Sequence, residues 1–195
     1  MRRIQVLHVE PTDVCQAACP QCSREINPEF NKNTKHHLRI EQLLRVFPEK
    51  NIKRLKKMFM CGVYGDPAAG TYTLDIYRYF RQVNPNIVLG MNSNGALQTT
   101  FYWHELGKLF SKPTDYVVFS IDGLEDTNHL YRRNVKWDKL VENITTYTSN
   151  GGFGIWEYLL FEHNEHQIYL AKFKCKQFGL DMIRFKKPIG FEDYL

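Results

Sequence analysis

The sequence predicts an α/β fold built on a parallel sheet, and three observations indicate it. Short, mostly apolar runs recur along the chain, as in strands that are buried on both faces. Stretches with helical periodicity separate these runs, which is the alternation typical of βαβ units. From the second run onward, the runs begin about thirty residues apart, the size of one such unit. Because a complete (β/α)8 barrel has eight strands and six runs are visible, the sheet is either open and doubly wound or an incomplete barrel.

Each expected strand is short and dominated by aliphatic, β-branched or aromatic residues, which fit a pleated and buried surface. Polar or glycine-rich turns bound the runs. In chain order, the strands are expected at Ile4–Val9, Met58–Val63, Ile87–Met91, Tyr116–Ile121, Ile155–Phe161 and Met182–Phe185.

Between the strands, apolar side chains recur at helical spacing, with charged residues on the opposite face. Thr73, Thr100 and Asn164 stand near helix starts, where a side-chain oxygen can accept a hydrogen bond from a free backbone N–H. The helices are expected at Arg39–Phe47, Leu74–Val83, Tyr102–Phe110, Trp137–Tyr147 and His166–Phe178.

Length and composition fit one domain over residues 1–195, with 43% hydrophobic and 24% charged residues. The longest clear apolar run, Tyr116 to Ile121, is too short to span a membrane. Polar residues follow the N-terminus at once, so the apolar core of a signal peptide is missing. Five cysteines, three of them in one cluster, do not form a disulfide framework. We therefore expect a reduced, cytoplasmic protein without membrane contact.

The formal net charge is +5, and basic residues concentrate in Lys50–Lys57 and Lys172–Lys176. Basic runs can mark contact with nucleic acid. Apolar residues interrupt both runs at helical spacing, so we interpret them as solvated helix faces.

Three cysteines stand at the spacing Cys15-x3-Cys19-x2-Cys22, shortly after the first expected strand. Thiolates are soft ligands that select Fe–S clusters, Zn²⁺ or Cu⁺. A [4Fe–4S] cluster normally takes four cysteines, so three would leave one iron open to a substrate or cofactor. A structural zinc site needs four ligands, and no further candidate lies at the usual spacing. The motif therefore favours an Fe–S cluster over zinc, whose fourth ligand would be His8, His36, His37 or Cys61.

Polar residues and glycines gather where the expected strands end. In parallel α/β folds, ligands bind beyond the carboxyl ends of the strands. Each segment taken singly is ordinary turn chemistry, but together with the cysteines the segments indicate a site along one rim. They are Cys61–Pro67, Asn92–Gly95, Ser120–Gly123, Glu162–Asn164 and Lys186–Pro188.

These motifs together resemble the radical S-adenosylmethionine (radical SAM) superfamily, over essentially the whole chain. The cysteine triplet matches the family's cluster motif in spacing and position, and Gly65-Asp66-Pro67 is similar to a variant of its Gly-Gly-Glu-Pro motif. Further segments resemble the branch of SPASM-like enzymes, which modify peptides and proteins. These segments are Ser120–Gly123 with Tyr131-Arg132, and Trp156–Gln167 with Gly179–Asp181.

The resemblance implies a partial (β/α)6 barrel, similar to a TIM barrel and open on one side. It implies that Cys15, Cys19 and Cys22 hold a [4Fe–4S] cluster whose fourth iron binds the amino and carboxylate groups of S-adenosylmethionine. Reductive cleavage of that cofactor would give methionine and a 5′-deoxyadenosyl radical, which abstracts hydrogen from a substrate. The implied cofactor-binding residues are Gly65, Asp66, Pro67, Asn92, Asn94, Ser120, Asp122, Arg132 and Leu160.

The chain departs from the family pattern at Asp66, in its C-terminal part, and at Gln21, where many members carry an aromatic residue just before the third cysteine. Asp66 replaces the usual glutamate and is one methylene shorter. No cysteine-rich extension for auxiliary clusters follows the sixth expected strand, and we expect the two other cysteines, Cys61 and Cys175, to pack in the core. An open barrel then needs a peptide or protein substrate, a partner subunit or an oligomer to close it. The expected electron donor is a flavodoxin or ferredoxin.

Two alternatives remain open on the sequence alone. One is a small radical SAM enzyme that acts on a nucleobase or nucleotide, which the compact length and positive charge permit. The other is a non-enzymatic Zn or Fe–S binding module whose basic faces contact nucleic acid.

Overall fold

A six-stranded parallel sheet forms the centre of the computed structural model, which describes residues 4–27, 29 and 35–188. Spatial order in the sheet follows chain order, so the first and sixth strands form its two edges. A doubly wound sheet would reverse the strand order at a switch point, so the fold is an open, partial barrel. The strands are β1 (Val6–Val9), β2 (Lys57–Met60), β3 (Val88–Ser93), β4 (Tyr116–Ser120), β5 (Gly154–Leu159) and β6 (Met182–Lys186).

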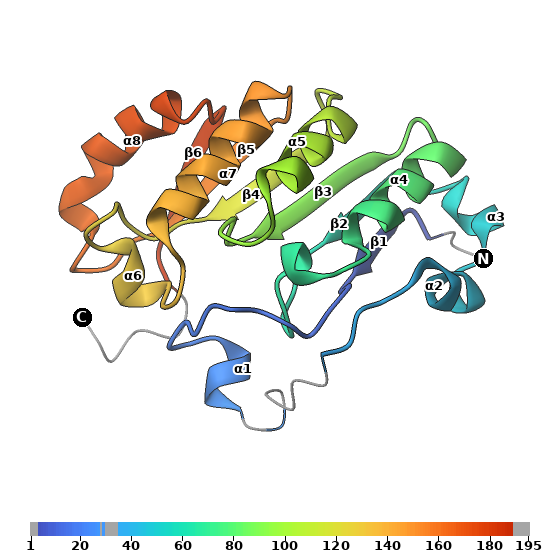
Figure 1. Cartoon of the computed structure of the whole chain (residues 1–195), viewed down its shortest axis with the longest axis horizontal. Helices are drawn as coiled ribbons and strands as arrows, with labels where there is room; N and C mark the ends of the chain where they lie inside the picture. Colours follow the sequence, from blue (N-terminus) through green and yellow to red (C-terminus); the bar gives the residue numbers. More distant parts are fainter. Residues whose placement is uncertain (1–3, 28, 30–34, 189–195) are drawn as a thin grey trace.

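Helices connect the strands. The longer ones are α2 (Ile40–Val46), α4 (Thr73–Val83), α5 (Thr100–Leu109), α7 (Trp137–Ser149) and α8 (Ile168–Gln177). Shorter pieces are α1 (Ser23–Ile26), α3 (Glu49–Ile52), α6 (Asn128–Tyr131) and the 3₁₀ turns at Pro67–Ala69 and Glu165–Gln167. Figure 1 shows α4, α5, α7 and α8 in a row over one face of the sheet, with α1 and α6 set apart below that row.

The core lies between this row of helices and the sheet. Large aromatic side chains fill it: Trp103 of α5 lies 5.4 Å from Phe119 of β4 and 6.2 Å from Tyr147 of α7, measured between ring centroids. All three side chains are fully buried. Aromatic pairs at such distances add to the stabilisation that comes from burial, so β4 is fixed against both α5 and α7.

The opposite face of the sheet is less covered. His8 and Phe59 stack on it with ring centroids 4.6 Å apart, and Lys57 lies over the rings of Phe59 and Tyr116. The alternation of side chains along β2 explains why one face is more covered than the other. Met58 and Met60 point toward the helices and are fully buried, while Lys57 and Phe59 point to the opposite face and are only half-buried.

The six strands and five helices expected from the sequence are confirmed, with some ends shifted. β2 ends before Cys61 because the chain turns sharply there, and a side chain at Gly62 would lie 1.6 Å from the carbonyl oxygen of Gly65. Thr99, rather than Thr100, accepts the capping hydrogen bond at the start of α5. The short helices α1, α3 and α6 were not expected, because four residues are too few to show helical periodicity.

Among the residues described, no helix combines the length and the apolar character needed to cross a membrane.

A buried ion pair ties α4 to two strands, which allows a stability test. Asp115, whose side chain is fully buried just before β4, pairs with Arg81 of α4 and accepts a 2.8 Å hydrogen bond from the Leu89 N–H of β3. Asp115→Ala should lower the free energy of unfolding in urea by about 3 kcal/mol or more, because it leaves a largely buried guanidinium unpaired. The matched control is Asp75→Ala, which removes an exposed partner of Arg78 and should cost less than about 1 kcal/mol. Equal losses for the two variants would contradict this account of the pair.

Candidate functional site

A pocket of about 310 Å³ lies at the carboxyl ends of the strands, where parallel α/β folds place their ligands. We call it the cysteine pocket, because four of the five cysteines line it. Its walls come from the loops after β1 and β2, the ends of β3, β4 and β5, and the segment around α6. The lining residues are Cys15, Ala17, Cys19, Cys22, Arg24, Cys61, Gly62, Val63, Gly65, Asp66, Pro67, Asn92, Ser93, Asn94, Ser120, Tyr131, Arg132 and Glu157.

The cysteine loop after β1 packs directly on the loop after β2. A side chain at Gly65 would meet the Thr12 carbonyl oxygen at 2.5 Å and the Val14 backbone nitrogen at 2.7 Å, so only glycine permits this approach. The N–H of Asp66 donates to the Val14 carbonyl at 2.9 Å. Glu10 adds a second tie, because its Oε2 accepts from the backbone N–H groups of the β2 loop, at residues 63 and 64, both at 3.1 Å.

Asp66 is buried and its carboxylate is fully engaged by hydrogen bonds. Oδ1 accepts from the Ser93 hydroxyl and the Ala68 N–H, both at 2.8 Å. Oδ2 accepts from the backbone N–H of Asn94 at 2.7 Å and from its side-chain amide at 2.6 Å. This carboxylate therefore joins the loop after β2 to the end of β3.

Asn94 extends the network to the cysteine loop. Its Oδ1 accepts from the Gln16 side chain at 2.7 Å, and its Nδ2 lies 3.7 Å from the sulfur of Cys15. Asn92 and Ser120 also line the pocket, but no hydrogen bond of their side chains is found within the described part of the chain. Their polar groups remain available to a ligand, whereas those of Asn94 are largely committed to the protein.

On the far side of the pocket, Arg132 joins Asp122 to a cysteine. Its Nε donates to Asp122 Oδ2 at 2.6 Å, and its Nη1 lies 3.7 Å from the sulfur of Cys19. Asp122 is fully buried, and its other oxygen accepts from the Leu159 N–H at 2.7 Å. Asp122 thus holds Arg132 in place and anchors β5.

Burial favours the protonated form of two of the loop thiols, those of Cys15 and Cys19, when no metal is bound. Burial raises the pKa of the Cys15 thiol to about 12, and the negative charge of Asp66 adds to this, while the Ala17 N–H and the Arg24 charge act in the opposite direction. Burial also raises the pKa of Cys19, against the opposing charge of Arg132. A metal that binds these thiols must therefore displace protons.

Arg24 lines the same pocket from α1. Only 5% of its surface is exposed, and its Nε and Nη1 atoms are buried without a hydrogen-bond acceptor among the described residues. Arg24 was not among the residues expected from the sequence, where it appears only as a cation two positions after the third cysteine.

The structure brings most of the expected site residues together. Asp122 and Leu160 are the two that lie outside the pocket lining. Cys175 packs in the core as expected, but Cys61 lies in the pocket wall, because the strand ends before it and the chain turns toward the cysteine loop. No group of three or more His, Cys, Asp or Glu side chains in the described ranges is arranged around a single metal ion.

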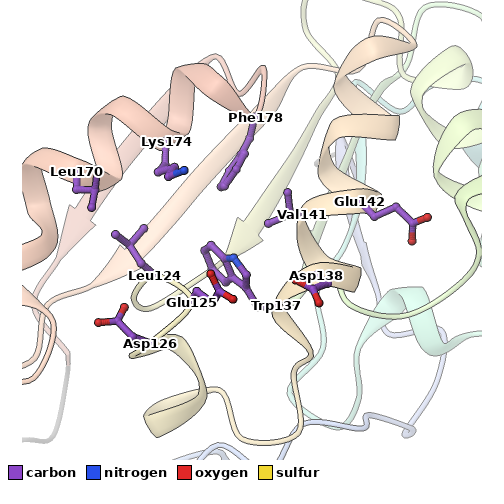
Figure 2. Close-up of a pocket in the computed structure, with 10 residues that line it drawn as sticks. All are labelled: Leu124, Glu125, Asp126, Trp137, Asp138, Val141, Glu142, Leu170, Lys174 and Phe178. Carbon is purple, nitrogen blue, oxygen red and sulfur yellow. The ribbon is translucent and has the colours of Figure 1, made fainter.

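A second hollow, of about 850 Å³, lies on the helical side of the sheet between α7 and α8. Figure 2 shows the apolar side chains that line it, among them Trp137 and Phe178, together with carboxylates such as Glu125 and Asp138. It shares no residue with the cysteine pocket.

A family model described as the radical SAM superfamily matches residues 9–169. The search of curated proteins gives no match. The chain is similar in structure to SuiB of Streptococcus suis bound to precursor peptide SuiA, with 14% identity and a TM-score of 0.72 over 94% of this chain and 39% of that one.

Two further solved structures show the same similarity. The first is anSMEcpe with bound AdoMet and a peptide, with 14% identity and a TM-score of 0.69 over 95% of this chain and 51% of that one. The second is TYW1 with a lysine-pyruvate adduct bound, with 16% identity and a TM-score of 0.59 over 95% and 66%. The present chain spans less than two thirds of each of these proteins, and the likeness at such identities is one of fold.

The raised pKa of Cys15 predicts a slow and steeply pH-dependent reaction with iodoacetamide in the metal-free protein. Since only the thiolate reacts, the rate at Cys15 should rise about tenfold per pH unit between about pH 7 and pH 9 without levelling off. Fragment-ion mass spectrometry distinguishes Cys15 from its neighbours. In urea the same rate should level off near the ordinary thiol pKa of about 8.5. A plateau below about pH 9 in the folded protein would contradict the assignment.

Proposed function

The chain belongs to the radical SAM superfamily, and from this premise we propose that Cys15, Cys19 and Cys22 bind a [4Fe–4S] cluster beside a site for S-adenosylmethionine. The superfamily uses this cluster and this cofactor. The observation that carries the proposal is that the three thiols of the motif line one pocket together with Gly65 and Asp66.

The residues present fit the cluster. Each thiolate of a cluster binds a separate iron atom, and three thiolates leave one iron for an additional ligand. The pocket also contains a buried guanidinium with unused donors, as a site for a negatively charged group requires. These features support a cluster site that stays open on the side of the pocket.

We assign the cofactor's polar groups to the residues at the strand ends. Gly65 and Pro67 present the backbone after β2, which suits the amino group of the methionine moiety. Asn92 and Ser120 line the pocket from β3 and β4 and offer donors and acceptors for hydroxyl or carboxylate groups. Because the Asp66 carboxylate is fully engaged, its role is to hold this arrangement, and any direct contact comes from its backbone.

When bound and reduced, the cluster would supply the electron that cleaves the sulfonium of S-adenosylmethionine, and the 5′-deoxyadenosyl radical released with methionine would abstract a hydrogen atom from the substrate. The chain's own residues bind and orient the cofactor and keep the thiols at one end of the pocket.

The substrate class that we propose is a peptide or protein. SuiB is described with a precursor peptide bound, and anSMEcpe with a peptide bound. The open sheet supports this, because Val6 of β1 and Met182 of β6 leave apolar surface exposed at its two edges, at 52% and 42%. A large substrate, a partner subunit or a second copy would cover these edges, and a flavodoxin or ferredoxin would deliver the electron.

The first test is reconstitution with iron and sulfide under anaerobic conditions. The wild-type chain should become brown and, with a strong reductant, convert S-adenosylmethionine into 5′-deoxyadenosine, measured by chromatography with mass detection. Cys22→Ala should reduce that product at least about hundredfold, because it removes a cluster ligand. Cys175→Ala is the matched control, since Cys175 is buried in α8, and it should retain activity. A colourless, zinc-loaded wild-type protein would contradict the proposal.

The second test concerns Asp66. Asp66→Ala removes the acceptor of four hydrogen bonds at the rim and should weaken S-adenosylmethionine binding to the reconstituted protein at least about tenfold, or about 1.4 kcal/mol. Equilibrium dialysis with radiolabelled cofactor measures the affinity. The control is Glu125→Ala, a carboxylate of the hollow between α7 and α8, which should leave the affinity unchanged. Unchanged affinity in both variants would remove Asp66 from the cofactor site.

A further inference from the structure

Arg24 is a buried cation whose partner is not among the described residues. Its side chain lines the cysteine pocket, and two of its nitrogen atoms, Nε and Nη1, are buried without an acceptor in the part of the chain that the structure describes. An arginine keeps its charge under all ordinary conditions. A buried charge is costly unless it is paired and hydrogen-bonded, so the site as a whole must supply an anion.

The second arginine of the pocket shows what a satisfied guanidinium looks like here. Arg132 donates to Asp122 at 2.6 Å, so its charge is balanced by a fully buried carboxylate. Within the described ranges, no such carboxylate pairs with Arg24. The positive charge of Arg24 acts to lower the pKa of the Cys15 thiol, against the larger effect of burial, which raises it.

The position of Arg24 ties it to the thiols rather than to a mobile ligand. It stands in α1, whose N-cap is Cys22, and the N–H of Cys22 donates to the Cys19 carbonyl at 2.9 Å. The guanidinium is therefore fixed by the same short turn that fixes two of the three sulfur atoms.

We propose that Arg24 donates hydrogen bonds to sulfur atoms of the bound [4Fe–4S] cluster and raises the cluster's reduction potential. This inference rests on the proposed function. Reduction adds one negative charge to a centre that three thiolates have already made negative, and a neighbouring cation stabilises the reduced form more than the oxidised one. Net charge and hydrogen bonds to the sulfurs are among the factors that set the potential of such clusters.

The test is a redox titration of the reconstituted full chain, followed by electron paramagnetic resonance in the absence of S-adenosylmethionine. At the wild-type midpoint, Arg24→Gln should lower the ratio of reduced to oxidised cluster at least tenfold, which corresponds to a shift of about 59 mV for one electron. Arg24→Lys keeps the charge but loses the planar pair of donors, so its midpoint should fall between the two. The control Arg133→Gln makes the same change in charge at an exposed side chain close to the pocket and should leave the midpoint unchanged.

The outcomes separate this inference from the function on which it rests. A wild-type chain that assembles no cluster overturns both. A wild-type chain that cleaves S-adenosylmethionine, together with an unshifted midpoint in Arg24→Gln, overturns only the role of Arg24. An unshifted midpoint with weaker cofactor binding would assign the guanidinium to the cofactor's carboxylate instead. If Arg24→Gln takes up no iron, Arg24→Lys carries the test, and a midpoint equal to that of the wild type overturns the proposal.

Discussion

The arrangement of the site depends on how one buried carboxylate is satisfied. Asp66 accepts four hydrogen bonds, two of them from Asn94 and the others from Ala68 and Ser93. A carboxylate in such a position is tolerable only because every donor is in place. The same bonds fix the end of β3 against the loop after β2, and the Asp66 N–H fixes the cysteine loop against both. The hydrogen bonds that stabilise the buried Asp66 carboxylate therefore also determine the shape of the pocket.

The sheet makes this arrangement possible by bringing distant segments to one edge. Parallel strands in chain order place the residues that follow β1, β2, β3 and β4 side by side, although more than a hundred residues separate Cys19 from Arg132. Helices on one face bury the aromatic core, while the cysteine pocket lies at the carboxyl ends of the strands. Parallel α/β folds share this arrangement, in which the residues that pack the core and the residues that bind ligands lie in different parts of the fold.

Much of this could be predicted from the sequence, because strand patterning and the cysteine spacing are local signals. The six strands, the rim residues and the family all followed from such signals. The partners of the rim side chains did not. Asp66 was expected among the cofactor-binding residues; it lines the pocket, and its oxygens accept hydrogen bonds from Ser93, Asn94 and Ala68. Asp122 lies outside the pocket lining and pairs with Arg132. These hydrogen bonds and ion pairs join residues that are far apart in the sequence, so local patterns do not predict them. Arg24 was missed because what distinguishes it is burial without an acceptor among the described residues, and burial is known only from the folded chain.

The close approach of Gly65 to the backbone of Val14 has a consequence for biogenesis. The three cysteines leave the ribosome before the segments that shape their loop, and that surface is completed only when the segment through Arg133 has been synthesised and has folded. Until those segments have folded, the three thiols of the nascent chain would lie on a loop without a fixed conformation. Under the proposed function, iron and sulfide would be delivered after translation has passed α6, and a maturation factor that recognises the folded carboxyl ends of the strands would act later than one that recognises the cysteine motif alone.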